Sequence, residues 1–328
     1  MKRCVRAISV AFALIAAGAA IAQSYPVKPI RVVVPFPGGP SGVDQGLRVA
    51  QQKVAEFLGQ PLIIDNRSGA NGMIGSENVA RAAPDGYTLL FTTPSTHVTA
   101  IFITKNMPYD PVKDFTPISA ALEPVTGLVA SPSVPANNVR ELVEFARRNP
   151  GKLSYASSGI GSVFHLTGEM FKQAAGIDIL HVPYKGTQQA LTDTMSGQNS
   201  LTLAAVSGVI PLAKSGKLKL LAVLEAKRFA LLPDVPTVGE TLPGFEKPAS
   251  WFGFFGPAGL PQPIVFRVQA DVVRGFSVPE VRNRLEEMGL VVIGSTPAEF
   301  AAILQKGYEI YGQAAKAAGI RWSIWVRG

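Results

Sequence analysis

Two short loops rich in glycine and small hydroxyl residues carry the groups in this sequence that are best suited to chemistry. The first is Phe36-Pro37-Gly38-Gly39-Pro40-Ser41, which follows an apolar run, and the second is Ser157-Ser158-Gly159-Ile160-Gly161-Ser162. Because glycine lacks a side chain, backbone N–H groups and small hydroxyls in such loops can approach a carboxylate closely. Either loop alone is also typical of an ordinary strand-to-helix turn. The pair together predicts a site for a small anion.

Other polar residues lie beside these loops. Asp44 falls near the start of the helix expected after the first loop, where it either pairs with Arg48 or accepts hydrogen bonds from loop N–H groups or a ligand amine. His165 either orients the second loop or has a purely structural role, and Lys185 is either at the site or solvated. We take the following residues as ligand-binding candidates: Phe36, Pro37, Gly38, Gly39, Ser41, Asp44, Thr92, Thr93, Ser157, Ser158, Gly159, Gly161, Ser162, His165, Tyr184 and Lys185.

The sequence lacks the patterns of the common catalytic and cofactor sites. His97, His165 and His181 have no metal-ligand spacing. There is no Gly-x-Ser-x-Gly nucleophile elbow and no Walker loop. Gly159-Ile160-Gly161 begins a dinucleotide fingerprint, but Phe164 stands where its third glycine is needed. We therefore expect no catalytic residue, no metal and no cofactor, and keep an exported enzyme acting on an organic acid as the rival hypothesis.

The amino terminus predicts export. A basic start is followed by an apolar run over residues 7–20 and by Ala20-Ile21-Ala22, which is the pattern of a signal peptide covering residues 1–22. The single cysteine, Cys4, lies in this leader, so the mature chain has no disulfide. The 31 basic and 23 acidic residues are scattered, which argues against nucleic-acid binding. We expect a periplasmic protein.

Strand and helix patterns alternate along the rest of the chain, as in parallel sheets with crossover helices. β-Branched runs predict strands over Ile30–Val34 and Leu62–Asn66, and helical spacing predicts Val43–Leu58 as a helix. Further strands are expected at 87–91, 127–130, 153–156, 179–182, 201–206, 218–224 and 251–255, and further helices at 74–83, Val139–Arg148, Val163–Ala175, Thr187–Met195, 264–276, 281–288 and 297–318. These elements predict two α/β halves with a ligand cleft between them.

The chain resembles a known family over nearly all of its mature length. The motifs that carry the resemblance are Tyr25-Pro26-Val27-Lys28-Pro29-Ile30, Asp65-Asn66-Arg67, Pro84-Asp85-Gly86-Tyr87, Pro108-Tyr109-Asp110-Pro111, His181-Val182-Pro183-Tyr184-Lys185-Gly186 and Leu232-Pro233-Asp234-Val235-Pro236. They are similar to those of the extracytoplasmic solute receptors of tripartite tricarboxylate transporters, often called Bug proteins.

This resemblance implies a fold, a function and partners. The fold is a two-domain periplasmic binding protein of type II, a Venus flytrap, with domain I over 23–122, domain II over 123–225 and a return to domain I over 226–328, the C-terminal helix packing on domain II. The two loops would pinch a small carboxylate between the domains of a monomer that passes it to membrane permease subunits and catalyses no reaction. A receptor that feeds a sensor kinase is the remaining alternative.

Overall fold

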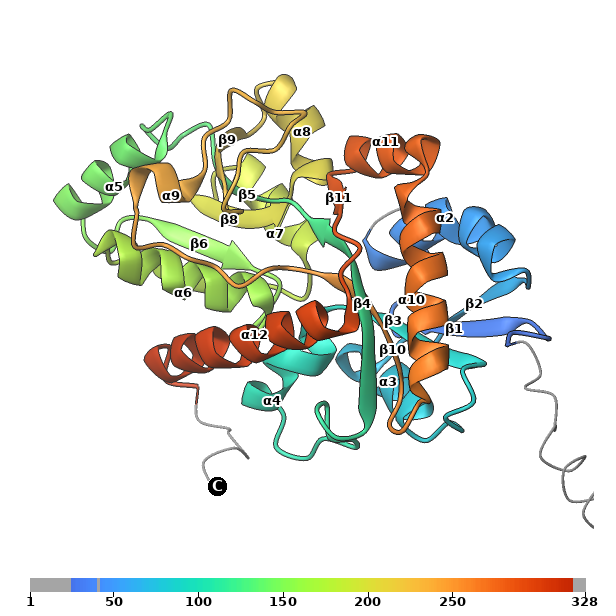
Figure 1. The fold of residues 1–328 in the computed structure, drawn as a ribbon. Coiled ribbons are helices and arrows are strands. Elements are labelled where there is room, and N and C mark those ends of the chain that lie inside the picture. Colours follow the sequence, from blue (N-terminus) through green and yellow to red (C-terminus); the bar gives the residue numbers. More distant parts are fainter. Residues whose placement is uncertain (1–24, 40–41, 321–328) are drawn as a thin grey trace, which may run out of the picture.

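Two mixed β-sheets, each covered by helices, make up the protein (Figure 1). The structure is a computed structural model that describes residues 25–39 and 42–320, so the predicted leader and Ser41 lie outside the described residues. One sheet has six strands in the order β11-β4-β10-β3-β1-β2, and the other has five in the order β7-β6-β8-β5-β9. We call each sheet with its helices the first lobe and the second lobe.

The first lobe begins with the β-branched strand and the amphipathic helix that the sequence predicts. β1 (Ile30–Val34) pairs in parallel with β2 (Leu62–Asn66) and β3 (Thr88–Thr92). α2 (Val43–Leu58) buries Leu47, Ala50 and Val54 and ends at Gly59, whose left-handed φ of 74° suits glycine. The short helices η1 (Ala70–Gly72) and α3 (Met73–Ala80) precede β3, and η2 (Ser95–Thr99) and α4 (Ala100–Ile103) follow it.

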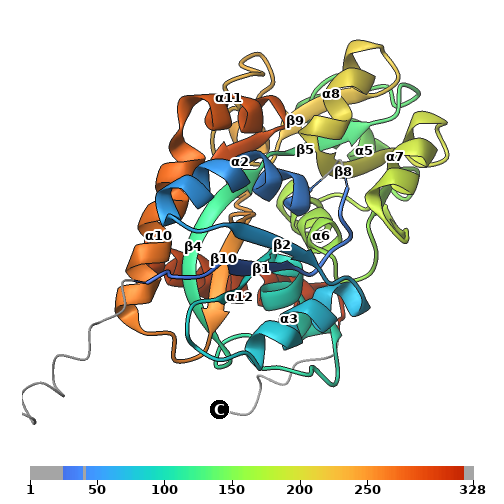
Figure 2. The ribbon, with the colours of Figure 1, turned by 90° about the vertical axis from the view of Figure 1, so that its right-hand side faces the viewer.

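The rest of the first sheet runs antiparallel, which corrects the parallel arrangement expected from the alternation of strands and helices. β10 (Phe252–Pro257) pairs antiparallel with β3 and β4 (Phe115–Pro124), and β11 (Leu290–Val292) pairs antiparallel with β4. The helices α2, α10 (Gln262–Ser277) and α11 (Pro279–Glu287) pack on one face. α3, α4 and α12 (Pro297–Ala317) pack on the other (Figure 2).

The second lobe has its own buried core around a five-stranded sheet. β6 (Ser154–Ser157) pairs in parallel with β7 (Leu180–Pro183) and β8 (Leu201–Ala205), while β5 (Thr126–Ala130) runs antiparallel to β8 and β9 (Lys219–Val223). The helices of this lobe are α5 (Val139–Arg148), α6 (Val163–Ala175), α7 (Thr187–Met195), α8 (Val206–Lys214) and α9 (Val238–Thr241).

The chain passes between the sheets twice. Only Val125 separates β4 from β5, and the return runs from the end of β9 to β10 over residues 224–251. The C-terminal helix α12 lies along α6, where Tyr311 and Leu166 share one buried cluster (Figure 1). Among the residues described, none of the helices has both the length and the hydrophobicity needed to cross a bilayer.

Candidate functional site

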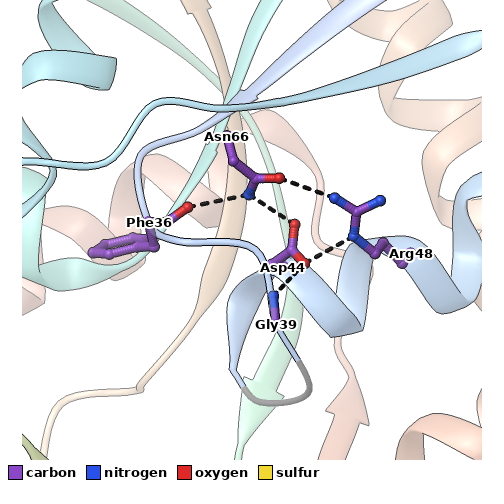
Figure 3. Close-up of polar contacts among 5 residues, drawn as sticks. All are labelled: Phe36, Gly39, Asp44, Arg48 and Asn66. Atoms are coloured by element: carbon purple, nitrogen blue, oxygen red, sulfur yellow. Dashed lines mark hydrogen bonds and ion pairs between the residues drawn. The ribbon is translucent and has the colours of Figure 1, made fainter.

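Asp44 anchors the first loop from the first turn of α2 (Figure 3). Its carboxylate, only 1% exposed, accepts hydrogen bonds from Arg48 Nε at 2.8 Å, Asn66 Nδ2 at 2.8 Å and the Gly39 N–H at 3.2 Å. Asn66 also donates to the Phe36 carbonyl at 3.1 Å. The ion pair with Arg48 and the bond to the loop, considered as alternatives from the sequence, both form.

The charge of Asp44 belongs to this network. Burial raises the pKa of Asp44, but the hydrogen bonds from Arg48, Asn66 and Gly39 outweigh burial and bring that pKa below its ordinary value. Pro37, Gly38 and Gly39 are exposed, and Phe36 is half-buried against the core. Asp44 therefore holds the loop in place at Gly39, while residues 37–39 are exposed to solvent. Ser41, which is also a ligand-binding candidate, lies outside the described residues.

His165 and His181 hold the second loop in place through hydrogen bonds. Ser157 Oγ lies 2.7 Å from His181 Nε2 and accepts the Gly159 N–H at 3.2 Å, and His165 Nδ1 accepts the Gly161 N–H at 2.9 Å. The rings of His165 and His181 stack with centroids 3.9 Å apart. Burial, followed by the neighbouring His165, lowers the pKa of His181 to about 4, and burial also lowers the pKa of His165 below its ordinary value.

The two other loop residues with a defined role make contacts inside the protein. Ser162 caps α6 by accepting a hydrogen bond from the His165 N–H at 3.2 Å. Gly161 has a φ of 72°, and a Cβ added there would lie 1.9 Å from Cγ2 of Ile103 in α4. The second loop therefore touches the first lobe directly at a position that only glycine can occupy, while Ser158 is half-exposed beside it.

The remaining candidates differ in their freedom to meet a ligand. The Tyr184 hydroxyl donates to Asp193 Oδ2 at 2.7 Å and accepts from Asn199 Nδ2 at 2.5 Å, so it is engaged within the second lobe. Lys185 is exposed. At the end of β3, Thr92 is buried and its hydroxyl lies 2.8 Å from that of Thr96, and the Thr93 hydroxyl lies 2.6 Å from that of Ser95.

A cavity of about 620 Å³ lies between the lobes, beside these loops. Its walls adjoin the predicted segments: Gly42 follows the first loop, Phe164 follows Ser162, and Thr187 follows Lys185. The lining mixes aliphatic and aromatic side chains with amides and hydroxyls from both lobes. The lining residues are Gly42, Gln45, Pro124, Phe164, Thr187, Gln188, Leu191, Ala204, Ala205, Ser207, Gly208, Phe252, Glu287, Met288 and Leu290.

The amino-terminal ends of three helices line this cavity. α2 begins after Gly42, α7 after Gly186 and α8 after Ala205, and among residues 25–39 and 42–320 no side chain caps any of these three ends. Each end carries backbone N–H groups with no partner inside the helix and the positive end of the helix dipole. At the start of α8, the first of these groups, the Val206 N–H, donates to the Val125 carbonyl at 3.0 Å. α6, in contrast, is capped by Ser162. The cavity is therefore lined by the starts of three helices, and Glu287 is the one charged side chain in the described lining.

Sequence reasoning missed the contributions of β8, α8 and the start of α7. Ala205, Ser207 and Gly208 carry no side chain that indicates chemistry, because what they offer is backbone N–H groups. The absence of Ser, Thr, Asp or Asn immediately before Thr187 and Val206 is the signal that indicates open helix ends. Within the described residues, no group of three His, Cys, Asp or Glu is placed to hold a metal ion.

The chain is similar to known proteins over most of its length. Residues 47–319 match the family model described as the tripartite tricarboxylate transporter family receptor. A UPF0065 protein encoded in the tcbD-tcbE intergenic region of Pseudomonas sp. strain P51 is 34% identical over 289 residues, which cover 88% of this chain and 85% of that protein.

Two solved structures with bound acids are similar over most of this chain. R. palustris Rpa4515 with adipate has a TM-score of 0.78 at 35% identity, covering 90% of this chain and 99% of that one. MatC (Rpa3494) from Rhodopseudomonas palustris with bound malate has a TM-score of 0.73 at 32% identity, covering 89% of this chain and 100% of that one. The expected two-domain periplasmic binding fold is thereby confirmed.

Proposed function

This chain belongs to the tripartite tricarboxylate transporter receptor family, and from that premise we propose that it captures a small carboxylate in the cavity between its lobes and delivers it to membrane permease subunits of that transporter type. Members of the family are solute-binding receptors and not enzymes, and they are periplasmic. We assign this chain to the periplasm, with residues 1–22 as its cleaved signal peptide, and propose that it acts as a monomer.

The proposal rests mainly on the amino-terminal ends of α2, α7 and α8, which all line one cavity and have no side-chain cap among the described residues. A carboxylate placed there receives backbone N–H groups and favourable helix dipoles without needing a lysine or arginine. The apolar walls, among them Phe164, Leu191 and Phe252, suit the carbon skeleton of an organic acid. Adipate and malate in the two similar structures are acids of this kind.

Closure of the lobes follows from the same geometry. We propose domain I over 23–122 and 226–328 and domain II over 123–225, although α9 of the returning segment packs on the core of domain II. The ligand is held by α2 from one domain and by α7 and α8 from the other. A carboxylate that contacts both lobes has more favourable interactions in the closed form than in the open form, so binding shifts the population toward closure. The first and second loops, residues 36–41 and 157–162, flank the cavity and complete the proposed site.

Binding of organic acids by the full chain tests the proposal. Thermal-shift screening of carboxylic acids, including adipate and malate, finds ligands because binding to the native state raises the melting temperature. Ser207→Asp places a carboxylate at the start of α8 inside the cavity and should weaken the best acid by tenfold or more, which is about 1.4 kcal/mol. Ser215→Asp, just after the same helix, is the control. If no acid binds, or if both variants bind equally well, the proposal is wrong.

A further inference from the structure

A buried ion pair lies where the chain passes between the lobes. Lys247 Nζ is 3.1 Å from Glu225 Oε1, and the two side chains are only 2% and 9% exposed. Glu225 stands at the beginning of the return segment 224–251 and Lys247 near its end. Both ends of the second crossing are therefore tied together in the protein interior.

The Glu225–Lys247 ion pair also contacts the first crossing, where β4 leads into β5. The two carboxylate oxygens of Glu225 accept the N–H of Thr126, the first residue of β5, at 3.1 and 3.0 Å. Lys247 Nζ donates in addition to Ser250 Oγ at 3.2 Å, two residues before β10. One ion pair thus links β5, the start of the return segment and the approach to β10.

This ion pair lies on the opposite side of the connecting strands from the ligand cavity. A second cavity of about 600 Å³ is lined by Glu123, Val125, Glu225 and Lys247, whereas Pro124, between the first two, lines the ligand cavity. Along β11, Val291 faces the second cavity and its neighbour Leu290 faces the ligand cavity. A rotation of the lobes about these strands that narrowed one cavity would therefore widen the other.

The amine of Lys247 keeps its charge beside Glu225. Burial lowers the pKa of Lys247, but the carboxylates of Glu225 and Glu123 outweigh burial and bring that pKa above its ordinary value, so the amine stays charged. Because separating a buried ion pair leaves both charges without compensation, the pair resists any movement that parts its members. Movement of the lobes must accordingly take place around it.

We infer that Glu225 and Lys247 are positioning residues of the ligand site: they contact no ligand, but by joining both crossings they restrict the angle between the lobes. The inference rests on the proposed capture of a ligand between the lobes. Loss of the pair should leave each lobe folded and let the ligand-free protein sample a wider range of angles, because hinge motion is absorbed by a few residues of the connections.

The test is an interlobe distance distribution measured by double electron–electron resonance without any ligand. The single cysteine is removed by Cys4→Ser in the full chain, and spin labels are attached at Gln52→Cys on α2 and Gln189→Cys on α7, both exposed positions. The variant is Glu225→Gln/Lys247→Met, in which the amide carbonyl introduced at position 225 can still accept the Thr126 N–H. We expect this variant to widen the distribution about 1.5-fold or more.

A neighbouring exposed ion pair provides the control. Arg228 and Glu240, 2.6 Å apart in the same return segment, do not reach the first crossing, and Arg228→Met/Glu240→Gln should leave the width unchanged. If the double variant of the buried pair does not fold, Glu225→Gln alone should widen the distribution in the same direction. An unchanged width in the Glu225 variants, or equal widening in the control, would overturn the inference. Failure of every acid in the thermal-shift screen, adipate and malate included, to narrow the distribution of the unsubstituted protein would count against the proposed function instead.

Discussion

Replacing Asp44 by asparagine should loosen the first loop and destabilise the first lobe. The carboxylate accepts three hydrogen bonds while almost fully buried, and Arg48, one of the donors, is half-exposed (Figure 3). The half-exposed ion pair contributes about 0.5–1 kcal/mol because solvent screens it. The bonds from Asn66 and Gly39 contribute roughly 1.5–3 kcal/mol each when the acceptor is charged. Because asparagine keeps one acceptor oxygen, we expect a net loss of about 2–4 kcal/mol.

The assay is urea denaturation of the full chain, combined with calorimetric titration of the acid that raises the melting temperature most in the thermal-shift screen. Affinity for that acid should fall about tenfold, which is about 1.4 kcal/mol, because the Gly39 end of the loop loses its anchor. Glu56→Gln is the matched control on the same helix, since Glu56 pairs with Lys53 in solvent and should contribute less than about 0.5 kcal/mol. An Asp44→Asn variant as stable as Glu56→Gln would refute this account of the network.

The pH dependence of the Asp44 effect has a definite sign. The folded-state pKa of Asp44 lies below the ordinary value of 3.8, so its contribution to stability is present above that value and is lost as the pH falls through the folded-state pKa. The difference in stability between the unsubstituted protein and Asp44→Asn should therefore shrink in strong acid. A difference that grows on acidification would contradict the reasoning.

Three further predictions concern the second loop. Because His181 has a pKa of about 4 in the folded protein and an ordinary value of 6.5, stability should fall as the pH drops from 6.5 to 4, and His181→Gln should flatten that slope in urea titrations. Gly161→Val should cost about 2–4 kcal/mol in melting experiments through its positive φ and its clash with Ile103, whereas Gly39→Val should be far milder because nothing lies within 4 Å of an added Cβ. Ser158→Ala should weaken acid binding by roughly 1–3 kcal/mol by calorimetry, and unchanged affinity would remove this residue from the site.

The elements that could be predicted are those whose sequence has a strong local period and a clear end. β1 is a β-branched run before Pro35, α2 has an apolar face and ends at Gly59, and both occupy the residues expected. The helix expected over 74–83 ends at Ala80, where Arg81 leaves the helical conformation. The helix was expected to end at residue 83 because Pro84 follows, and this expected end is three residues too late. A helix need not continue to the residue before a proline.

Two of the longer elements that were not expected, β4 and α8, contain residues that normally interrupt such elements. β4 includes Pro117 and Pro124, and α8 includes Gly208 and Pro211, so local propensity argues against both. β4 forms because β10 and β11 pair with it from distant parts of the chain. This long-range pairing is also why the first sheet is mixed, which a strand-helix alternation does not reveal.

The site predicted from the sequence and the cavity in the structure share the kind of group that they offer a ligand more than they share residues. Glycine and serine loops indicated a carboxylate held by backbone groups, and the cavity does present backbone N–H groups from three helices. Asp44, Ser157, His165 and Tyr184 bond mainly within the protein, where side-chain type alone does not separate support of a loop from contact with a ligand.

The most direct test of the central claim is a crystal structure of this protein with the acid that raises its melting temperature most in a series containing adipate and malate. We predict a carboxylate between the lobes, within hydrogen-bonding distance of backbone N–H groups at the starts of α2, α7 and α8, where Gly42, Thr187 and Ser207 line the cavity. An acid bound entirely within one lobe, or a carboxylate held by a lysine or arginine side chain away from these helix ends, would contradict it.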